Sequence, residues 1–189
     1  MIWTGRLSAI YTHDDPAAET ANIVALIVGW NGPFYPLYVI ALAGYHDAAP
    51  AALTMLATPL FLMLPWLSRR SSRAARLGLV LVGTANTLWC VKLLGSASGV
   101  ELFLLPCVAL ATLLFREQEQ TAMLLAAALP LAAYCVPFSA FGPALLQHTA
   151  LVSARLYALN AASVLVLTAV LAVQFARLLR RVAKESEQG

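Results

Sequence analysis

The segment Gly29–Tyr38, with the sequence GWNGPFYPLY, places two prolines, two glycines and an asparagine in the middle of an uncharged run. That run extends from Ala21 to Gly44 and contains no Asp, Glu, Lys, Arg or His. Such a run is typical of a membrane-spanning helix, because about 20 apolar residues cross roughly 30 Å of hydrocarbon. Each proline removes a backbone donor and frees a carbonyl one turn earlier, so we expect a kink between about Gly29 and Tyr35. The glycines would let a neighbouring helix approach there.

The composition extends this interpretation to the whole chain. Of the 189 residues, 61% are hydrophobic and 11% are charged, and the mean hydropathy is +0.78. A soluble domain of this length could not bury so much apolar surface. We therefore predict an all-α polytopic membrane protein, a bundle of six transmembrane helices. The predicted spans are residues 21–44, 48–66, 77–94, 100–115, 121–138 and 156–179.

Positive charge is distributed unevenly over this topology. Only Lys92 and Arg155 fall on the predicted outer side, against ten cationic residues on the inner side. Inner segments of membrane proteins carry an excess of Lys and Arg, so we expect both the N-terminal segment 1–20 and the C-terminal tail 180–189 to be cytoplasmic. Residues 1–20 have no long apolar core, which argues against a secretory signal. We expect a multi-pass protein of the bacterial cytoplasmic (inner) membrane. The ten inner cations are Arg6, Arg69, Arg70, Arg73, Arg76, Arg116, Arg177, Arg180, Arg181 and Lys184.

Motifs for common catalytic and metal chemistry are absent from the sequence. It contains no HExxH, no glycine-rich phosphate loop and no GxSxG. Its three histidines fall in predicted loops, and its three cysteines fall in three different spans without a CxxC pair, where they are expected to be packing residues. We therefore expect neither an enzyme nor a metal or other cofactor. Membrane lipids are the expected partners, and nucleic acid is not.

Uncharged polar and aromatic residues recur at a similar depth in several spans. Asn31, Tyr35 and Tyr38 follow a helical i, i+4, i+7 spacing, and Asn86, Trp89 and Cys90 form a similar stripe. Polar groups in lipid need partners, so these side chains should point inward. Two interpretations remain open at this stage. The asparagines either hydrogen-bond between helices, or they line a cavity that opens to the outer side.

On the second interpretation, a small and mostly apolar ligand enters from the outer side between the first, third, fifth and sixth spans. A neutral ligand is expected because burying an unpaired ion there is costly. Asn31 and Asn86 would form the polar floor of the cavity. The predicted wall residues are Tyr35, Trp89, Tyr134, Tyr157 and Asn160.

Lys92 and Glu101 lie near the outer ends of consecutive spans, joined by a loop that contains Gly95 and Gly99. A tight hairpin would bring them within ion-pairing distance at the rim of the cavity. The pair would either fix the hairpin or contact a polar group of the ligand.

The last span carries a short heptad-like seam. Leu171, Phe175, Leu178 and Val182 are spaced 4, 3 and 4 residues apart. This spacing favours a homodimer through the last helix, which is a common way to pass a signal across a membrane.

Two stretches resemble known receptor domains. The run VELFLLPC (Val100–Cys107) with LLFREQE (Leu113–Glu119) resembles the fourth span and following loop of the six-helix membrane domains attached to bacterial class III adenylyl cyclases. The run GPFYPLY (Gly32–Tyr38), with a Trp-plus-basic loop after the second span, resembles the six-helix sensor of quorum-sensing histidine kinases. The resemblance implies a sensor that binds a lipophilic small molecule and controls a cytoplasmic output domain or partner. A small transporter or channel for an uncharged or lipophilic solute is the alternative.

Overall fold

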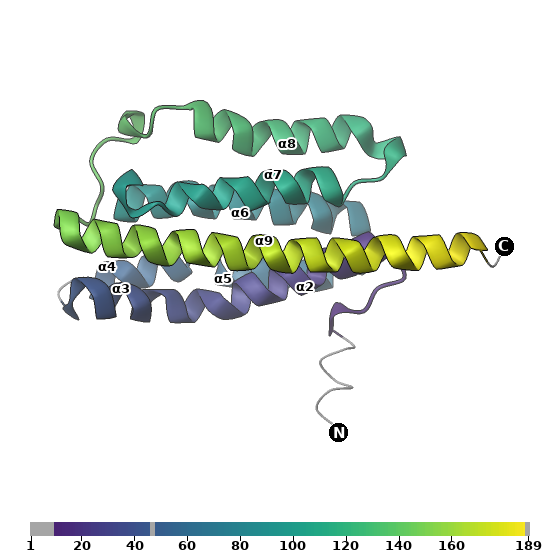
Figure 1. The fold of residues 1–189 in the computed structure, drawn as a ribbon, viewed down its shortest axis with the longest axis horizontal. Coiled ribbons are helices and arrows are strands. Elements are labelled where there is room, and N and C mark those ends of the chain that lie inside the picture. Colours follow the sequence, from purple (N-terminus) through teal and green to yellow (C-terminus); the bar gives the residue numbers. More distant parts are fainter. Residues whose placement is uncertain (1–9, 46–47, 188–189) are drawn as a thin grey trace, which may run out of the picture.

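The computed structural model describes residues 10–45 and 48–187, and every regular element within these ranges is a helix. The predicted all-α class is therefore confirmed. Figure 1 shows the helices side by side along the long axis of one bundle. The α-helices are α2 (Pro16–Asn31), α3 (Tyr35–Ala43), α4 (Ala48–Ala51), α5 (Thr58–Ser68), α6 (Ser72–Leu94), α7 (Leu104–Leu113), α8 (Gln120–Cys135) and α9 (Ala150–Glu187). Short 3-10 helices are η1 (Gly32–Phe34), η3 (Ala52–Met55), η4 (Ser96–Ser98), η5 (Val100–Phe103), η6 (Glu117–Glu119) and η7 (Phe138–Phe141).

Four helical stretches are long and apolar enough to cross a membrane: Pro16–Ala43, Ala49–Ser68, Ser72–Leu94 and Ala150–Arg180. They correspond to the first, second, third and sixth predicted spans. The fourth span is a shorter apolar helix at Val100–Leu113, and α8 has 16 residues. A membrane protein is thus supported, while the count of six spans and the side on which the termini lie stay predictions.

The first span begins at Pro16, earlier than the predicted Ala21, because Asp15 caps it by accepting a hydrogen bond from the backbone N–H of Ala17 at 3.1 Å. The helix then changes to the 3-10 helix η1 at Gly32–Phe34 before it continues as α3. This interruption lies where the two prolines predicted a kink.

Glycine allows α2 and α5 to pack closely at this interruption. A Cβ atom on Gly32 would lie 2.2 Å from Thr58 Oγ1, and one on Gly29 would lie 3.0 Å from Leu62 Cδ2. The distance at Gly32 is too short for a real side chain, and the distance at Gly29 is tighter than most real Cβ contacts. The predicted approach of a neighbouring helix is confirmed, and that neighbour is α5.

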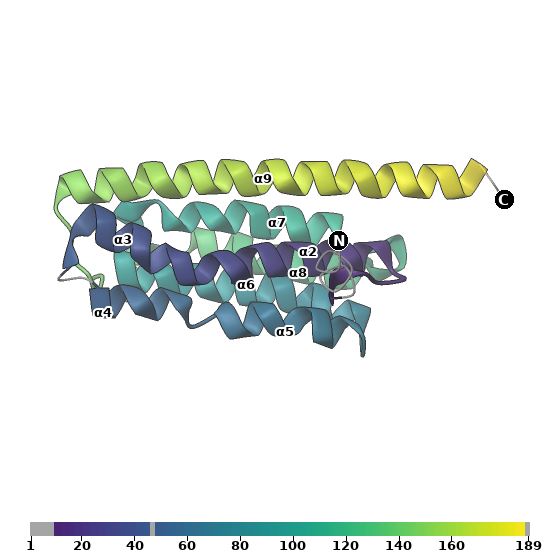
Figure 2. The ribbon, with the colours of Figure 1, turned by 90° about the horizontal axis from the view of Figure 1, so that it is seen from below.

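Helix α6 lies among α2, α5, α7 and α8, and α9 packs across α2, α3 and α7. Figure 2 shows α9 along one side of the bundle, with its C-terminal end projecting beyond the other helices. Leu171, the first residue of the predicted dimer seam, is only 4% exposed and belongs to the core of its own chain. The side chain of Val182 lies outside the described part, and the dimer itself stays a prediction.

Candidate ligand cavity

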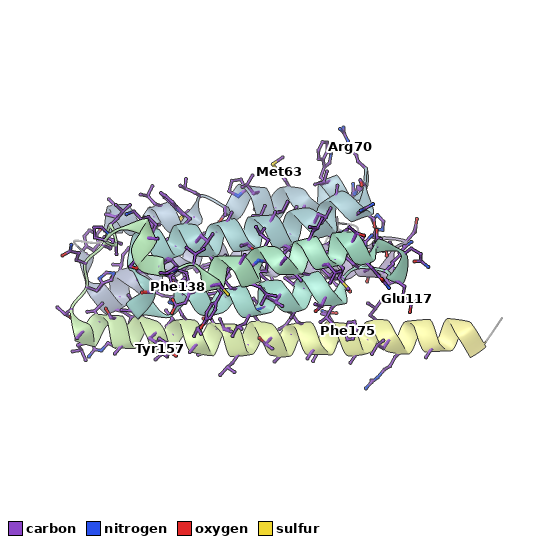
Figure 3. The ribbon with its side chains drawn as sticks, turned by 90° about the horizontal axis from the view of Figure 1, so that it is seen from above. Met63, Arg70, Glu117, Phe138, Tyr157 and Phe175 are labelled. Atoms are coloured by element: carbon purple, nitrogen blue, oxygen red, sulfur yellow. The ribbon has the colours of Figure 1, made fainter. Side chains whose placement is uncertain are left out.

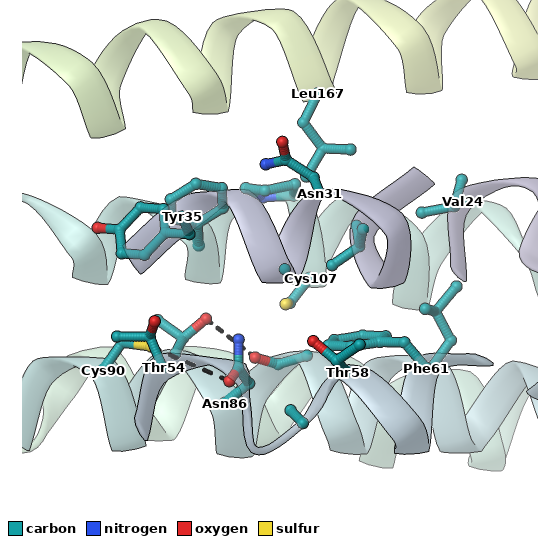
Figure 4. A pocket seen from close by; sticks show the side chains of 18 of the residues that line it. Val24, Asn31, Tyr35, Thr54, Thr58, Phe61, Asn86, Cys90, Cys107 and Leu167 are labelled. Carbon is teal, nitrogen blue, oxygen red and sulfur yellow. Dashed lines mark hydrogen bonds between the residues drawn. The ribbon is translucent and has the colours of Figure 1, made fainter. Parts of the chain in front are cut away.

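A cavity of about 120 Å³ lies inside the bundle, between α2, α5, α6, α7 and α9. Its walls are mostly apolar, and Figure 4 shows the lining side chains from several helices gathered around it. None of the lining residues is Asp, Glu, Lys, Arg or His. The lining residues are Val24, Val28, Asn31, Gly32, Tyr35, Thr54, Ala57, Thr58, Phe61, Leu79, Gly83, Asn86, Thr87, Cys90, Val100, Phe103, Pro106, Cys107, Leu110 and Leu167.

Interruptions in two helices shape this cavity. The 3-10 turn η1 interrupts the first span, and the second span is interrupted between η3 and α5, at Leu56 and Ala57. Because a regular helix presents a continuous surface of side chains, these interruptions allow the walls to separate locally. On the opposite side, Gly83 brings α6 against α7, where an added Cβ would lie 3.0 Å from Cys107 Sγ.

Three of the hydroxyl groups that line the cavity already have partners, whereas Thr58 Oγ1 has none among the described residues. Thr54 Oγ1 donates to the carbonyl of Ala51 at 2.7 Å, and Thr87 Oγ1 donates to the carbonyl of Gly83 at 2.9 Å. The Tyr35 hydroxyl donates to Asn160 Oδ1 at 2.8 Å. These groups therefore have little need of a ligand.

Asn31 and Asn86 are different. The Asn31 side chain makes no hydrogen bond with the residues that the structure describes, and Asn86 has only a 3.9 Å contact from Cys90 Sγ to its Oδ1. In Figure 4, Asn31 projects toward α9 beside Leu167, whereas Asn86 projects into the cavity from α6. The sequence predicted both residues as a polar floor, and the structure brings them to one cavity.

Asn160 makes interhelical hydrogen bonds, which is the alternative to a cavity lining that the sequence left open. Its side chain is 0% exposed, accepts from Tyr35, and donates through Nδ2 to the carbonyl of Ser98 at 2.9 Å. It thus joins α9 to α3 and to the hairpin at residues 95–99. Tyr35 borders the cavity and Asn160 lies behind it.

Three aromatic residues predicted for the walls lie outside the cavity. Trp89 donates through Nε1 to the carbonyl of Leu53 at 2.9 Å, on the other face of α6. Tyr134 on α8 is 53% exposed and meets Phe138 edge to face. Tyr157 on α9 is 47% exposed, and Figure 3 shows it toward the same end of the bundle as Phe138. These residues have the predicted depth but point in other directions.

The predicted rim pair of Lys92 and Glu101 is not among the ion pairs of the described residues. Lys92 Nζ donates to the carbonyl of Pro143 at 2.8 Å, which ties α6 to the segment before α9. Glu101 Oε2 is buried without a hydrogen-bond partner in the described part of the chain. The hairpin at residues 95–99 is instead held by backbone hydrogen bonds and by Asn160.

Residues of the second and fourth spans were missing from the predicted site. Thr54, Ala57 and Phe61 come from the second span, and Pro106 and Cys107 come from the fourth, while α8 provides none of the lining residues. The predicted fifth span is thus replaced by the fourth. The glycine at position 83 and the proline at position 106 are the sequence signals that point to this wall.

A second polar assembly, the Arg76 cluster, lies at the opposite end of the bundle and consists of Asp15, Ser72, Arg76, Arg116 and Glu119. Arg76 is 2% exposed and makes a bidentate contact with Glu119, with Nη1–Oε2 at 2.7 Å and Nη2–Oε1 at 3.0 Å. Its Nη1 also donates to the carbonyl of Leu114 at 2.7 Å.

Asp15 completes the Arg76 cluster. It accepts a hydrogen bond from the Ser72 hydroxyl and lies 3.3 Å from Arg116 Nη2 and 3.8 Å from Arg76 Nη2. The cluster therefore joins the start of α2, the start of α6 and the connection between α7 and α8. Figure 3 shows Arg70 and Glu117 at this same end, away from Tyr157.

The carboxylates of the Arg76 cluster are held in their charged form. Burial raises the pKa of Asp15, but the hydrogen bonds from Ser72 and the Ala17 backbone and the charge of Arg76 lower it below the ordinary 3.8. Burial likewise raises the pKa of Glu119, and the hydrogen bonds from Arg76 and the Arg116 backbone bring it below 4.5.

Comparison with known proteins gives no match: no family model, no curated protein and no solved structure is similar to this chain.

Proposed function

We propose that the chain is a membrane sensor that binds a small, uncharged and mostly apolar molecule in the cavity and passes the binding event to a cytoplasmic output domain or partner. The observation that carries the proposal is the Asn86 amide, which is partly buried in a mostly apolar cavity and has only a 3.9 Å contact from Cys90 Sγ, with the exposed Asn31 amide on the same lining. An unsatisfied polar group in an apolar environment costs on the order of several kcal/mol when it is fully buried. A ligand with a hydrogen-bonding group would reduce that cost at Asn86.

The dimensions and charge of the cavity indicate the class of ligand. A volume of about 120 Å³ is close to that of apolar protein cavities of about 150 Å³ that accept benzene. Because no lining residue carries a charge, an ionic ligand would be buried without a counter-ion. The apolar walls would provide most of the affinity, and the two amides would orient the ligand.

Helix α9 offers a path from the cavity to the output. Leu167 of α9 lines the cavity, and Asn160 of α9 accepts the hydrogen bond of Tyr35, another lining residue. The same helix continues to Glu187, beyond the other helices. A ligand that moves Leu167 or Tyr35 would therefore act on the element that leaves the bundle.

The experiment compares benzyl alcohol with toluene, which has the same ring but no hydroxyl group. Binding to the purified protein in detergent is measured by saturation-transfer NMR and corrected for partition into micelles. We expect the wild type to prefer benzyl alcohol by about tenfold, the effect of one buried hydrogen bond of about 1.4 kcal/mol. The double variant Asn31→Leu, Asn86→Leu should lose this preference.

The matched control is Thr112→Val, which removes an exposed hydroxyl that bonds only within its own helix α7. This variant should keep the preference for benzyl alcohol. An equal preference in the wild type and in the double asparagine variant would contradict the proposed ligand site. The relay is tested separately, by whether a spin label on the exposed Arg177 changes mobility when benzyl alcohol is added.

A further inference from the structure

A groove of about 360 Å³ lies on the outside of the bundle, between α5 and α6. Its walls are apolar side chains of two membrane-spanning helices, and Leu56, Leu60 and Leu81 are half exposed along it. Trp89 closes one end, where its indole N–H is already bonded to the carbonyl of Leu53. The groove lining is Leu56, Ala57, Leu60, Leu81, Val82, Ala85, Asn86 and Trp89.

The groove and the interior cavity share two lining residues, Ala57 and Asn86. Ala57 stands at the interruption between η3 and α5 and contributes only a methyl group to both linings. Asn86 borders both spaces from α6, and its amide N–H groups have no partner among the described residues. A molecule that contacts Asn86 can therefore have one part in the cavity and another in the groove.

The two spaces differ in chemistry. The cavity lining contains the Asn31 and Asn86 amides and several hydroxyl groups, whereas the groove offers only hydrocarbon apart from Asn86 and the already bonded Trp89. No lining residue of either space is charged. This combination suits a molecule with an uncharged polar end and an apolar chain, and it disfavours a charged headgroup.

We propose that the ligand is a single-chain amphiphile with an uncharged polar end. It enters sideways from the bilayer between α5 and α6, places its polar end at Asn86 inside the cavity, and leaves its chain in the groove. This inference rests on the proposed function, because it requires that the cavity binds a ligand. It replaces the outer entrance expected from the sequence by a lateral one.

The hydrocarbon chain gains little free energy by moving from lipid to the groove, since both surroundings are apolar. The role of the groove is therefore steric. It lets a long chain leave a cavity that is too small to enclose it. Chain length should matter only when the groove is blocked.

The probes are 1-butanol, which the cavity can enclose, and 1-dodecanol, which needs the groove. The groove is blocked by Ala85→Trp, at an exposed position of α6 in the groove lining. The matched control is Ala128→Trp, at an exposed position of α8, which contributes no lining residue. Binding is measured by NMR at equal probe concentration within the micelle, and thermal unfolding confirms that each variant is folded.

We expect Ala85→Trp to weaken 1-dodecanol binding by about tenfold, a typical effect of overfilling a packed site, and to leave 1-butanol binding unchanged. Ala128→Trp should change neither. Equal binding of 1-dodecanol to Ala85→Trp and wild type, with 1-butanol binding intact, would overturn the lateral site and leave the proposed function standing. If the double variant Asn31→Leu, Asn86→Leu binds both probes as tightly as the wild type does, the lateral site and the proposed function are both overturned.

Photolabelling provides an independent measurement. 1-Dodecanol with a diazirine at its methyl end should label the segments 56–60 and 81–85 of the wild type, and Asn86→Leu should remove this labelling. Labelling that is confined to α8, or that persists unchanged in Asn86→Leu, would overturn the proposed orientation.

Discussion

The Arg76 cluster and the asparagine cavity both bring polar side chains into an apolar bundle, but they satisfy them differently. Arg76 donates to Ser72, Leu114 and Glu119, and the Glu119 carboxylate accepts in turn from the Arg116 backbone. Asn31 and Asn86 have no comparable partners among the described residues. A satisfied polar network holds a fold together, whereas an unsatisfied one leaves a requirement for another molecule.

The largest effect is expected at the Arg76 cluster. Arg76→Met leaves the buried carboxylate of Asp15 and the partly buried carboxylate of Glu119 without their central cation, and breaking a buried ion pair costs about 3–5 kcal/mol. Reversible unfolding in mixed detergent micelles measures this loss. Arg73→Met is the matched control, because Arg73 is exposed and its ion pair with Glu119 is long, at 4.0 Å. Loss of this exposed pair should lower the stability by about 0–1 kcal/mol. Equal losses in the two variants would contradict a structural role for the cluster.

The same cluster predicts the direction of pH dependence. The pKa values of Asp15 and Glu119 are lower in the folded protein than their ordinary values of 3.8 and 4.5. Their contribution to stability is therefore complete above those ordinary values and is lost as the pH falls through the lowered ones. The unfolding temperature of the wild type should fall below about pH 4, and that of Arg76→Met should fall less. A wild type that becomes more stable in acid would contradict this sign.

Three of the twenty residues that line the cavity, Asn31, Tyr35 and Asn86, were predicted from the sequence. Helical spacing placed Asn31 and Tyr35 on one face of the first span, and the prolines located the interruption beside them. Depth alone cannot fix the direction in which a helix turns a side chain, so Tyr134 and Tyr157 were assigned to a wall that they do not reach.

Adjacency of helices was the second limit. The sequence did not show that α5 and α7 border the cavity, nor that Arg76 lies within the first turns of α6 rather than in a loop. Charge counting treated Arg76 as one inner cation among ten, although it is 2% exposed and fully bonded. Its role depends on Asp15 and Glu119, which are distant in sequence.

A third prediction concerns the link between the cavity and α9. Tyr35→Phe removes the donor to Asn160 Oδ1 and leaves a buried acceptor unsatisfied, which should cost about 1–3 kcal/mol. Tyr38→Phe is the matched control, because Tyr38 is 44% exposed, and its effect should be near zero. Unfolding in mixed micelles distinguishes the two. An unchanged stability of Tyr35→Phe would remove the hydrogen bond from the proposed relay.

The most direct test of the central claim compares Asn86→Leu with Asn160→Leu, measured without ligand by unfolding in mixed micelles and then with benzyl alcohol. Asn160→Leu should destabilise the protein by about 1–3 kcal/mol, because it leaves Tyr35 and the Ser98 carbonyl without partners. Asn86→Leu should leave stability unchanged or raise it by about 1 kcal/mol, since it removes an amide whose one hydrogen bond is the long 3.9 Å contact from Cys90 Sγ, and it should abolish the preference for benzyl alcohol over toluene. A loss of stability in Asn86→Leu equal to that in Asn160→Leu, with the preference for benzyl alcohol retained, would show that Asn86 serves packing and not a ligand.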